Sequence, residues 1–285
     1  MKVLVTGGRG QLGRALAVTT PAAVELISVG RDSIDLADPV AAELAVGRIA
    51  PDVVINAAAY TAVDRAENEP ELAQRVNAES VGALARAAAR GGGRLVQVSS
   101  DFVFDGASSV AYRPGDARNP LSVYGASKAA GEDSAELEAL IVRTSWVHAA
   151  HGTNFVLTML RLMRERGAVR VVAAQIGAPT WATGLAHTIW GLLDQCAKGV
   201  YHHRDAGVAS WYDLAVAAAE EGLAQGLLGS LPTIEPIPGA EYPTPARRPA
   251  FSLLDDSATR IALGAPAVQW RTNLRYMLME QKSHG

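Results

Sequence analysis

The chain has 285 residues, of which 49% are hydrophobic and 19% charged, a composition typical of a globular protein and not of a disordered one. Its 26 basic and 29 acidic residues leave a formal charge of −3, so no basic field favours nucleic acid or an anionic membrane surface. The single cysteine, Cys196, excludes an intrachain disulfide. No apolar run approaches the ~18 residues of a membrane span, and we expect a cytoplasmic protein that acts on small molecules.

The amino terminus reads as a strand, a glycine turn and a helix, in that order. The apolar residues 2–5 lead into Gly7, Gly10 and Gly13, and helix-favouring residues 14–17 follow. Gly7 permits a tight turn, Gly10 lets a pyrophosphate approach the backbone, and Gly13 lets the helix pack closely. The phosphates would sit at the positive end of the helix, so this segment predicts a dinucleotide site that also includes Gln11 and Leu12.

The rest of the chain predicts an α/β protein with a doubly wound parallel (Rossmann) sheet and a smaller mixed lobe. Four more short apolar runs are typical of buried parallel strands, and a long helical pattern covers residues 72–89. Proline and glycine become frequent beyond residue 169. We therefore assign residues 1–168 to a dinucleotide-binding domain and 169–285 to a mixed α/β substrate lobe that is interleaved with returning elements of the first domain. The four strands cover residues 26–29, 53–56, 95–98 and 140–143, and the later helices cover residues 184–197, 211–225 and 273–281.

A tyrosine and a lysine four positions apart, Tyr124 and Lys128, would share one face of a helix. The neighbouring ammonium should lower the pKa of the phenol toward the range in which proton exchange is efficient. Ser100 lies a short way upstream, and its hydroxyl could hydrogen-bond the same carbonyl oxygen. Together with the glycine loop, the three residues indicate a reductase.

The end of the second strand, at residues 30–32, should read the cofactor's ribose. Arginine there pairs with the 2′-phosphate of NADP, whereas an acidic residue binds the 2′-hydroxyl of NAD. Arg31 favours NADPH, and Asp32 leaves NADH possible. Asp35 and Leu36 are expected to flank the adenine.

Metal ligands are not expected. His202 and His203 are neighbours that would point to opposite faces of a strand, and no cysteine or carboxylate near them has ligand spacing for zinc.

Several segments, taken in order, resemble the extended short-chain dehydrogenase/reductases and, among them, the dTDP-4-dehydrorhamnose reductase family. The general resemblance rests on the glycine loop, residues 56–64, residues 99–106 and Tyr124-x-x-x-Lys128. The narrower one rests on residues 143–147, 177–181 and 242–249. It implies reduction of the C4 ketone of dTDP-4-dehydro-L-rhamnose, with hydride from NADPH or NADH and a proton from Tyr124. Lys128 would orient the nicotinamide ribose.

The same resemblance assigns residues to the two ligands. The small side chains of Ala57, Ala58 and Ala59 would leave room for the dinucleotide, and Trp146 would form an aromatic wall against the sugar. The other expected substrate contacts are Thr61, Ser100, Asp101, Phe102, Arg247 and Arg248, with the two arginines at the diphosphate.

Phe102 separates this chain from related dehydratases, which carry an Asp-Glu pair where this chain has Asp101-Phe102. Without the second carboxylate, the acid and base work of dehydration is unsupported. A non-catalytic dinucleotide-binding regulatory subunit, another sugar-nucleotide 4-ketoreductase and an epimerase remain as alternatives. Ala15 stands where the resemblance places a glutamate of metal-bridged dimers, so we expect a monomer or a weak homodimer.

Overall fold

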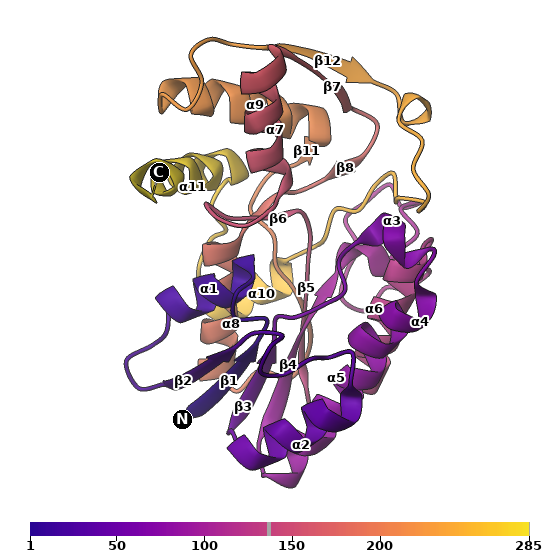
Figure 1. The fold of residues 1–285 in the computed structure, drawn as a ribbon, viewed down its shortest axis with the longest axis vertical. Helices are drawn as coiled ribbons and strands as arrows, with labels where there is room; N and C mark the ends of the chain where they lie inside the picture. Colours follow the sequence, from indigo (N-terminus) through magenta and orange to yellow (C-terminus); the bar gives the residue numbers. More distant parts are fainter. Residues whose placement is uncertain (136–137, 285) are drawn as a thin grey trace.

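The computed structural model describes residues 1–135 and 138–284, which form a lower lobe around a parallel sheet and an upper, mostly helical lobe (Figure 1). The lower lobe contains six parallel strands in the order β10-β5-β4-β3-β1-β2. Their bounds are β1 (Lys2–Thr6), β2 (Glu25–Val29), β3 (Val53–Asn56), β4 (Arg94–Ser100), β5 (Leu140–Thr144) and β10 (Gly199–His202). The predicted doubly wound Rossmann sheet is confirmed, and the five predicted strands are present.

The strands read as continuous apolar runs because helices cover both faces of the sheet. On one face Val3 and Val5 of β1 pack with α1 (Gln11–Val18) and α8 (Ala182–Asp194). On the other face Leu4 packs with α2 (Pro39–Ile49) and α5 (Ser80–Arg90). Within the sheet, β2 and β3 lie on opposite sides of β1. The strand order therefore reverses between β1 and β3, and in such folds ligands bind in the crevice at the carboxyl ends of these two strands.

The helix predicted over residues 72–89 is present, but it contains a π-helical turn. It begins as α4 (Pro70–Gln74), widens at Arg75–Glu79 and continues as α5. Within the turn, the Asn77 side chain accepts from the backbone N–H of Tyr60 at 2.8 Å and donates to Ser127 at 2.9 Å. The wider turn therefore lets a buried amide join the loop after β3 to α6 (Val123–Ser134).

The upper lobe has its own core, formed by α7 (Phe155–Arg166), α9 (Trp211–Ala224) and α11 (Trp270–His284). A parallel pair, β7 (Ala168–Val172) and β12 (Thr233–Ile237), closes it on one side. The remaining short elements are α3 (Val63–Ala66), a 3-10 turn at Asp101–Val103, β6 (Val147–His148), β8 (Ile176–Gly177), β9 (Thr180–Trp181), β11 (Ala209–Ser210), a 3-10 turn at Gly239–Glu241 and α10 (Ser257–Leu263).

Segments of the two cores alternate along the chain, so the domain boundary expected between residues 168 and 169 does not separate one core from the other. Before that point, α7 belongs to the upper core through Val156, Leu160 and Met163. After it, α8 and β10 return to the Rossmann core. The segment after β12, residues 242–254, descends from the upper lobe to lie beside α3 and then leads to α10 (Figure 1). We call residues 242–254 the strap.

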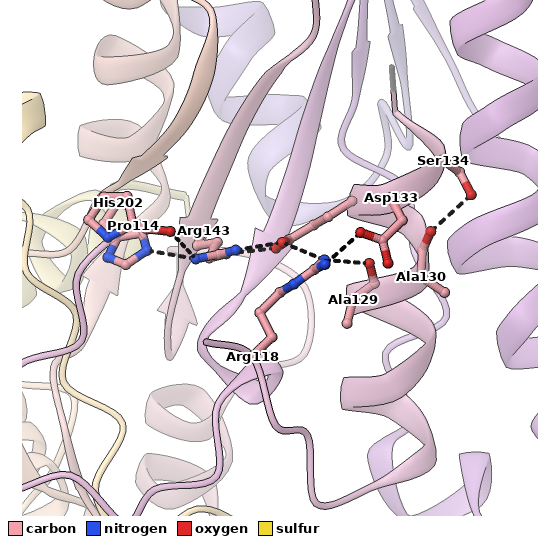
Figure 2. Close-up of polar contacts among 9 residues, drawn as sticks. Pro114, Arg118, Ala129, Ala130, Asp133, Ser134, Arg143 and His202 are labelled. Carbon is pink, nitrogen blue, oxygen red and sulfur yellow. Dashed lines mark hydrogen bonds and ion pairs between the residues drawn. The ribbon is translucent and has the colours of Figure 1, made fainter. Parts of the chain in front are cut away.

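A buried carboxylate fastens α6 to the sheet. Glu132 accepts from Nε of Arg143, on β5, at 2.8 Å and from its Nη2 at 2.7 Å. Arg118, in the loop that precedes the helix, donates to the same carboxylate at 3.2 Å (Figure 2). The Glu132 and Arg143 side chains are only 3% and 4% exposed, so neither charge could be left unpaired without a large loss of hydration.

Replacing Glu132 by alanine should therefore lower the free energy of unfolding by about 3–5 kcal/mol, because it leaves the Arg143 guanidinium buried without its anion. Chemical denaturation measures the change. Asp133→Ala is the matched control, since Asp133 also binds Arg118 but its side chain is 66% exposed, and it should cost less than about 1 kcal/mol. Equal losses of unfolding free energy in the two variants would show that the buried ion pair stabilises the fold no more than the exposed one.

Candidate active site

Tyr124 and Ser100 come together because the first turn of α6 packs directly on the 3-10 turn after β4. A Cβ at Gly125 would overlap the carbonyl oxygen of Phe102, so only glycine allows this approach. Ser122 caps the helix by accepting from the Gly125 N–H at 3.2 Å. The tyrosine thus stands in the first helical turn, beside the carboxyl end of β4.

Burial controls the phenol of Tyr124. It raises the pKa of Tyr124 to about 12, while a hydrogen bond with Ser100 acts in the opposite direction. The expectation that Lys128 would lower this pKa is wrong for the structure, in which desolvation is the largest effect. At neutral pH the phenol holds its proton, which is the form that a proton donor needs.

Lys128 lies one helical turn beyond Tyr124, and only 3% of its surface is exposed. Nζ donates to the carbonyl oxygen of Val98, on β4, at 2.7 Å. Burial lowers the pKa of Lys128 to about 8, and the negative charge of Glu132, one turn further along α6, opposes that shift. The lysine is consequently charged at neutral pH, and two of its three N–H donors have no hydrogen-bond partner in the part of the chain that the structure describes.

A buried polar chain connects Lys128 to the glycine loop across three strands. Thr6, the last residue of β1, donates to Asn56 at 2.6 Å, and Asn56 donates to Gln97 at 2.8 Å. Gln97 donates at 2.9 Å to the Val98 carbonyl that also binds Lys128. The same bonds therefore hold the carboxyl ends of β1, β3 and β4 in register around the crevice.

The glycine loop has the shape that a diphosphate requires. Gly7 has a φ of +70°, and a Cβ there would lie 2.8 Å from the Ala58 nitrogen, so loop and strand end touch backbone to backbone. A Cβ at Gly13 would overlap the Gly7 carbonyl. Gly10 caps α1 without a side chain, and no acidic residue lies in the first turn, which leaves the helix N–H groups free to bind an anion.

The other expected dinucleotide contacts surround this loop. Ala57, Ala58 and Ala59 follow β3 and are half-buried beside it. Gln11 and Leu12 begin α1, where the Gln11 side chain accepts from Asn154 at 2.9 Å and Leu12 is buried in the core. These residues fit a bound dinucleotide.

Beyond β2, Arg31 projects into solvent and pairs with Asp35 at 3.3 Å. Arg9, from the glycine loop, pairs with Asp32 at 2.9 Å, so two guanidinium groups lie where a ribose phosphate would be read. Leu36 is buried, and its carbonyl oxygen accepts from Ser80.

A pocket of about 350 Å³ lies between the 3-10 turn after β4 and the upper lobe. Its volume is within the size range of small-molecule sites. Trp146 stacks on Trp211 with ring centroids 3.7 Å apart, and Phe155 packs against Trp211 with centroids 4.6 Å apart. Trp146 reaches this position with a φ of +47°, a left-handed conformation that costs energy for a tryptophan. Phe102 lines the pocket and contacts the Tyr124 ring edge-to-face, with ring centroids 5.5 Å apart. Tyr124 itself is not among the lining residues, so it lies one side chain away from the pocket.

The strap forms the opposite wall, and it separates the two expected arginines. Arg248 lines the pocket and makes a bidentate ion pair with Asp64, at 3.0 and 2.8 Å, while Arg247 is exposed and lies outside the pocket lining. Thr61 is exposed just before α3. Asp101 is buried beneath the pocket, where its carboxylate accepts from Ser100 at 2.9 Å.

Sequence patterns alone missed part of this wall. Trp211 and Phe155 each follow a helix cap: Ser210 and Asp213 form a capping box at α9, and Asn154 caps α7. The sequence indicates that helices start at these caps, but no sequence pattern indicates that the aromatic residue after each cap faces a pocket. Arg9, Ser252 and Tyr242 were missed for the same reason, because each becomes a neighbour of the site only through tertiary folding.

Two further searches concern metals and membranes. Among residues 1–135 and 138–284, no group of three or more histidine, cysteine or acidic side chains is arranged to hold a metal ion. None of the helices in this part of the chain has both the length and the apolar composition needed to cross a bilayer.

Comparisons with known proteins agree with this geometry. The family model described as "RmlD substrate binding domain" matches residues 1–283. The dTDP-4-dehydrorhamnose reductase of Burkholderia thailandensis is 43% identical over 95% of this chain and 96% of its own length.

Two solved structures of enzymes with the same name are similar throughout. The one from Clostridium acetobutylicum has a TM-score of 0.92 and 34% identity, over 98% of both chains. The one from Bacillus anthracis, in complex with NADP, has a TM-score of 0.91 and 32% identity, over 98% of this chain and 99% of that one. The chain therefore belongs to the dTDP-4-dehydrorhamnose reductase family.

Proposed function

We propose that the protein reduces the C4 ketone of dTDP-4-dehydro-L-rhamnose to the alcohol, with NADPH as the hydride source. One observation carries this proposal: Ser100, Tyr124 and Lys128 lie together between a glycine loop that can bind a diphosphate and the pocket. Phe102 lies between Tyr124 and that pocket. Family membership supports the choice of substrate, because relatives over the full chain length carry the name dTDP-4-dehydrorhamnose reductase.

Tyr124, Lys128 and Ser100 have different roles in the proposed proton transfer. The bound dinucleotide supplies hydride to the carbonyl carbon, and Tyr124 supplies the proton to the carbonyl oxygen. Lys128, held by the Val98 carbonyl, directs its remaining donors toward the ribose and the phenol and stabilises the phenolate that proton transfer leaves. Ser100 offers a second hydrogen bond to the developing oxyanion. The aromatic wall and the strap exclude water from this step.

The alternatives predict different uses of the cofactor. An epimerase returns the hydride and consumes no NADPH, and a regulatory subunit turns over no sugar nucleotide. The intact set of Ser100, Tyr124 and Lys128, with Tyr124 protonated by burial, favours an enzyme over a regulatory subunit, whereas an epimerase is told apart by its use of the cofactor. Steady loss of NADPH absorbance only when the keto sugar is present would separate the three.

Tyr124→Phe should reduce kcat by at least about a thousandfold, because the ring stays and the proton donor goes. Absorbance at the NADPH band follows turnover, and fluorescence titration should show unchanged NADPH binding. The control is Tyr276→Phe, which removes a half-exposed hydroxyl on α11 and should leave kcat unchanged. Wild-type turnover in Tyr124→Phe would refute the assigned proton donor.

Arg31→Ala should lower kcat/KM for NADPH about tenfold and change kcat/KM for NADH less than twofold, since only NADPH carries the 2′-phosphate. The exposed arginine is a pairing group for that phosphate and not a part of the fold. Arg161→Ala, an exposed arginine on α7, controls for the loss of one positive charge. Equal effects on both cofactors would place the 2′-phosphate elsewhere.

Arg248→Ala should raise KM for the sugar nucleotide about tenfold or more, because it removes a guanidinium from the pocket wall next to the expected diphosphate. Arg247→Ala is the matched neighbour, and it should change KM less than threefold because Arg247 is exposed outside the pocket lining. Steady-state kinetics at saturating NADPH measures both. The reverse order of effects would mean that Arg247 and not Arg248 reaches the diphosphate.

A further inference from the structure

Asp101 is a buried carboxyl group beside the catalytic hydroxyls that the mechanism above does not use. It directly follows Ser100, and only 2% of its surface is exposed. Its Oδ1 accepts from Ser100 at 2.9 Å, while its Oδ2 is buried and makes no hydrogen bond of good geometry with the described residues, although the Ser252 hydroxyl lies near enough to favour the carboxylate. An ionised carboxylate with one oxygen unsatisfied in a dry site is costly, so this position favours the neutral acid more than a surface position would.

The groups that face Asp101 come from three elements. Ser100 lies on its own strand end, Tyr124 faces it from α6, and the strap presents the Ser252 hydroxyl. Lys128, the cation one turn beyond Tyr124, is bound to the Val98 carbonyl. Burial raises the pKa of Asp101 to about 6, and the hydroxyls of Ser252 and Ser100 oppose the rise.

Ser100 has one proton and cannot donate it twice. In the structure that proton goes to Asp101, and the Ser100 oxygen accepts from the backbone N–H of Phe102 at 3.1 Å. A serine hydroxyl in this arrangement has only acceptor capacity left. It therefore has no proton to offer a substrate carbonyl.

We propose that Asp101 is a positioning residue whose protonation reverses the Ser100 hydroxyl, so that Ser100 donates to the substrate carbonyl only when Asp101 is neutral. The neutral acid donates its own proton to the Ser100 oxygen and frees the serine proton to turn toward the ketone. No bond other than hydrogen bonds changes, and Asp101 acts through Ser100. This inference rests on the proposed ketone reduction.

The sign of the pH effect follows directly. As pH rises through about 6, Asp101 ionises, Ser100 turns back to it, and the transition state loses one hydrogen bond, worth about tenfold in rate. The rate should then level off, because Tyr124 still carries its proton. A separate decline belongs to Lys128, which loses its proton near pH 8.

The experiment is the pH profile of kcat/KM for the keto sugar, which reports ionisations of the free enzyme, at saturating NADPH between pH 5 and about 9. Wild type should fall about tenfold to a plateau around neutral pH. Asp101→Asn, whose amide nitrogen can donate to Ser100, should lack that step and stay at the upper level. Ser100→Ala should also lack the step but stay at the lower level. Ser252→Ala should move the step to higher pH, because it removes a donor that favours the carboxylate.

Asp116→Asn, an exposed carboxyl in a loop outside the pocket, is the control and should reproduce the wild-type step. Thermal unfolding checks that each variant is folded. A step that persists unchanged in Asp101→Asn or in Ser100→Ala would overturn the inference while the wild-type enzyme still reduces the ketone. Failure of the proposed function would look different, since wild type would then consume no NADPH with this sugar at any pH.

Discussion

The carboxylate of Glu132 is the group on which the geometry of the catalytic helix depends. It binds Arg143 on β5 and Arg118 in the loop before α6, and so ties the helix to the sheet on one side and to its own entry loop on the other. Tyr124 and Lys128 lie on the same helix, eight and four residues upstream. The same negative charge favours the charged form of Lys128, so one buried group both positions the catalytic lysine and helps to keep it protonated.

The sheet could be predicted from the sequence because its central strands β1, β3, β4 and β5 are largely buried on both faces, and strands of that kind are mostly apolar. The strand β10 was not predicted, since Val200 and Tyr201 are only half-buried at the sheet edge and two histidines follow them. Local periodicity also located the helix at residues 72–89 but not its π-helical turn, which depends on bonds from Asn77 to Tyr60 and Ser127. Those partners lie 17 and 50 residues away.

The proposed catalytic residues could be placed near one another from the sequence because they are close to regular elements: Ser100 ends a strand, and Tyr124 and Lys128 share one helix face. The protonation states of these residues could not be predicted from the sequence, because they depend on burial by segments that are distant in the chain. The phenol of Tyr124 was expected to have a lowered pKa, and burial raises it instead. Arg248 was expected from its position in a motif, but its pairing with Asp64 joins residues 184 positions apart, a distance that no sequence spacing reveals.

The strap explains why both lobes are needed for one proton transfer. The Rossmann lobe alone places Ser100, Tyr124 and Lys128 at the end of β4, where water would reach them. The strap covers that edge: Arg248 binds Asp64 beside α3, and a Cβ at Gly106 would lie 2.5 Å from the Pro249 side chain, so the two backbones are in close contact. Ser252 arrives with it next to Asp101. Desolvation is the largest effect on the pKa values of Tyr124, Lys128 and Asp101 alike, so burial sets the acid–base chemistry of this edge, and the strap takes part in it through Ser252 beside Asp101.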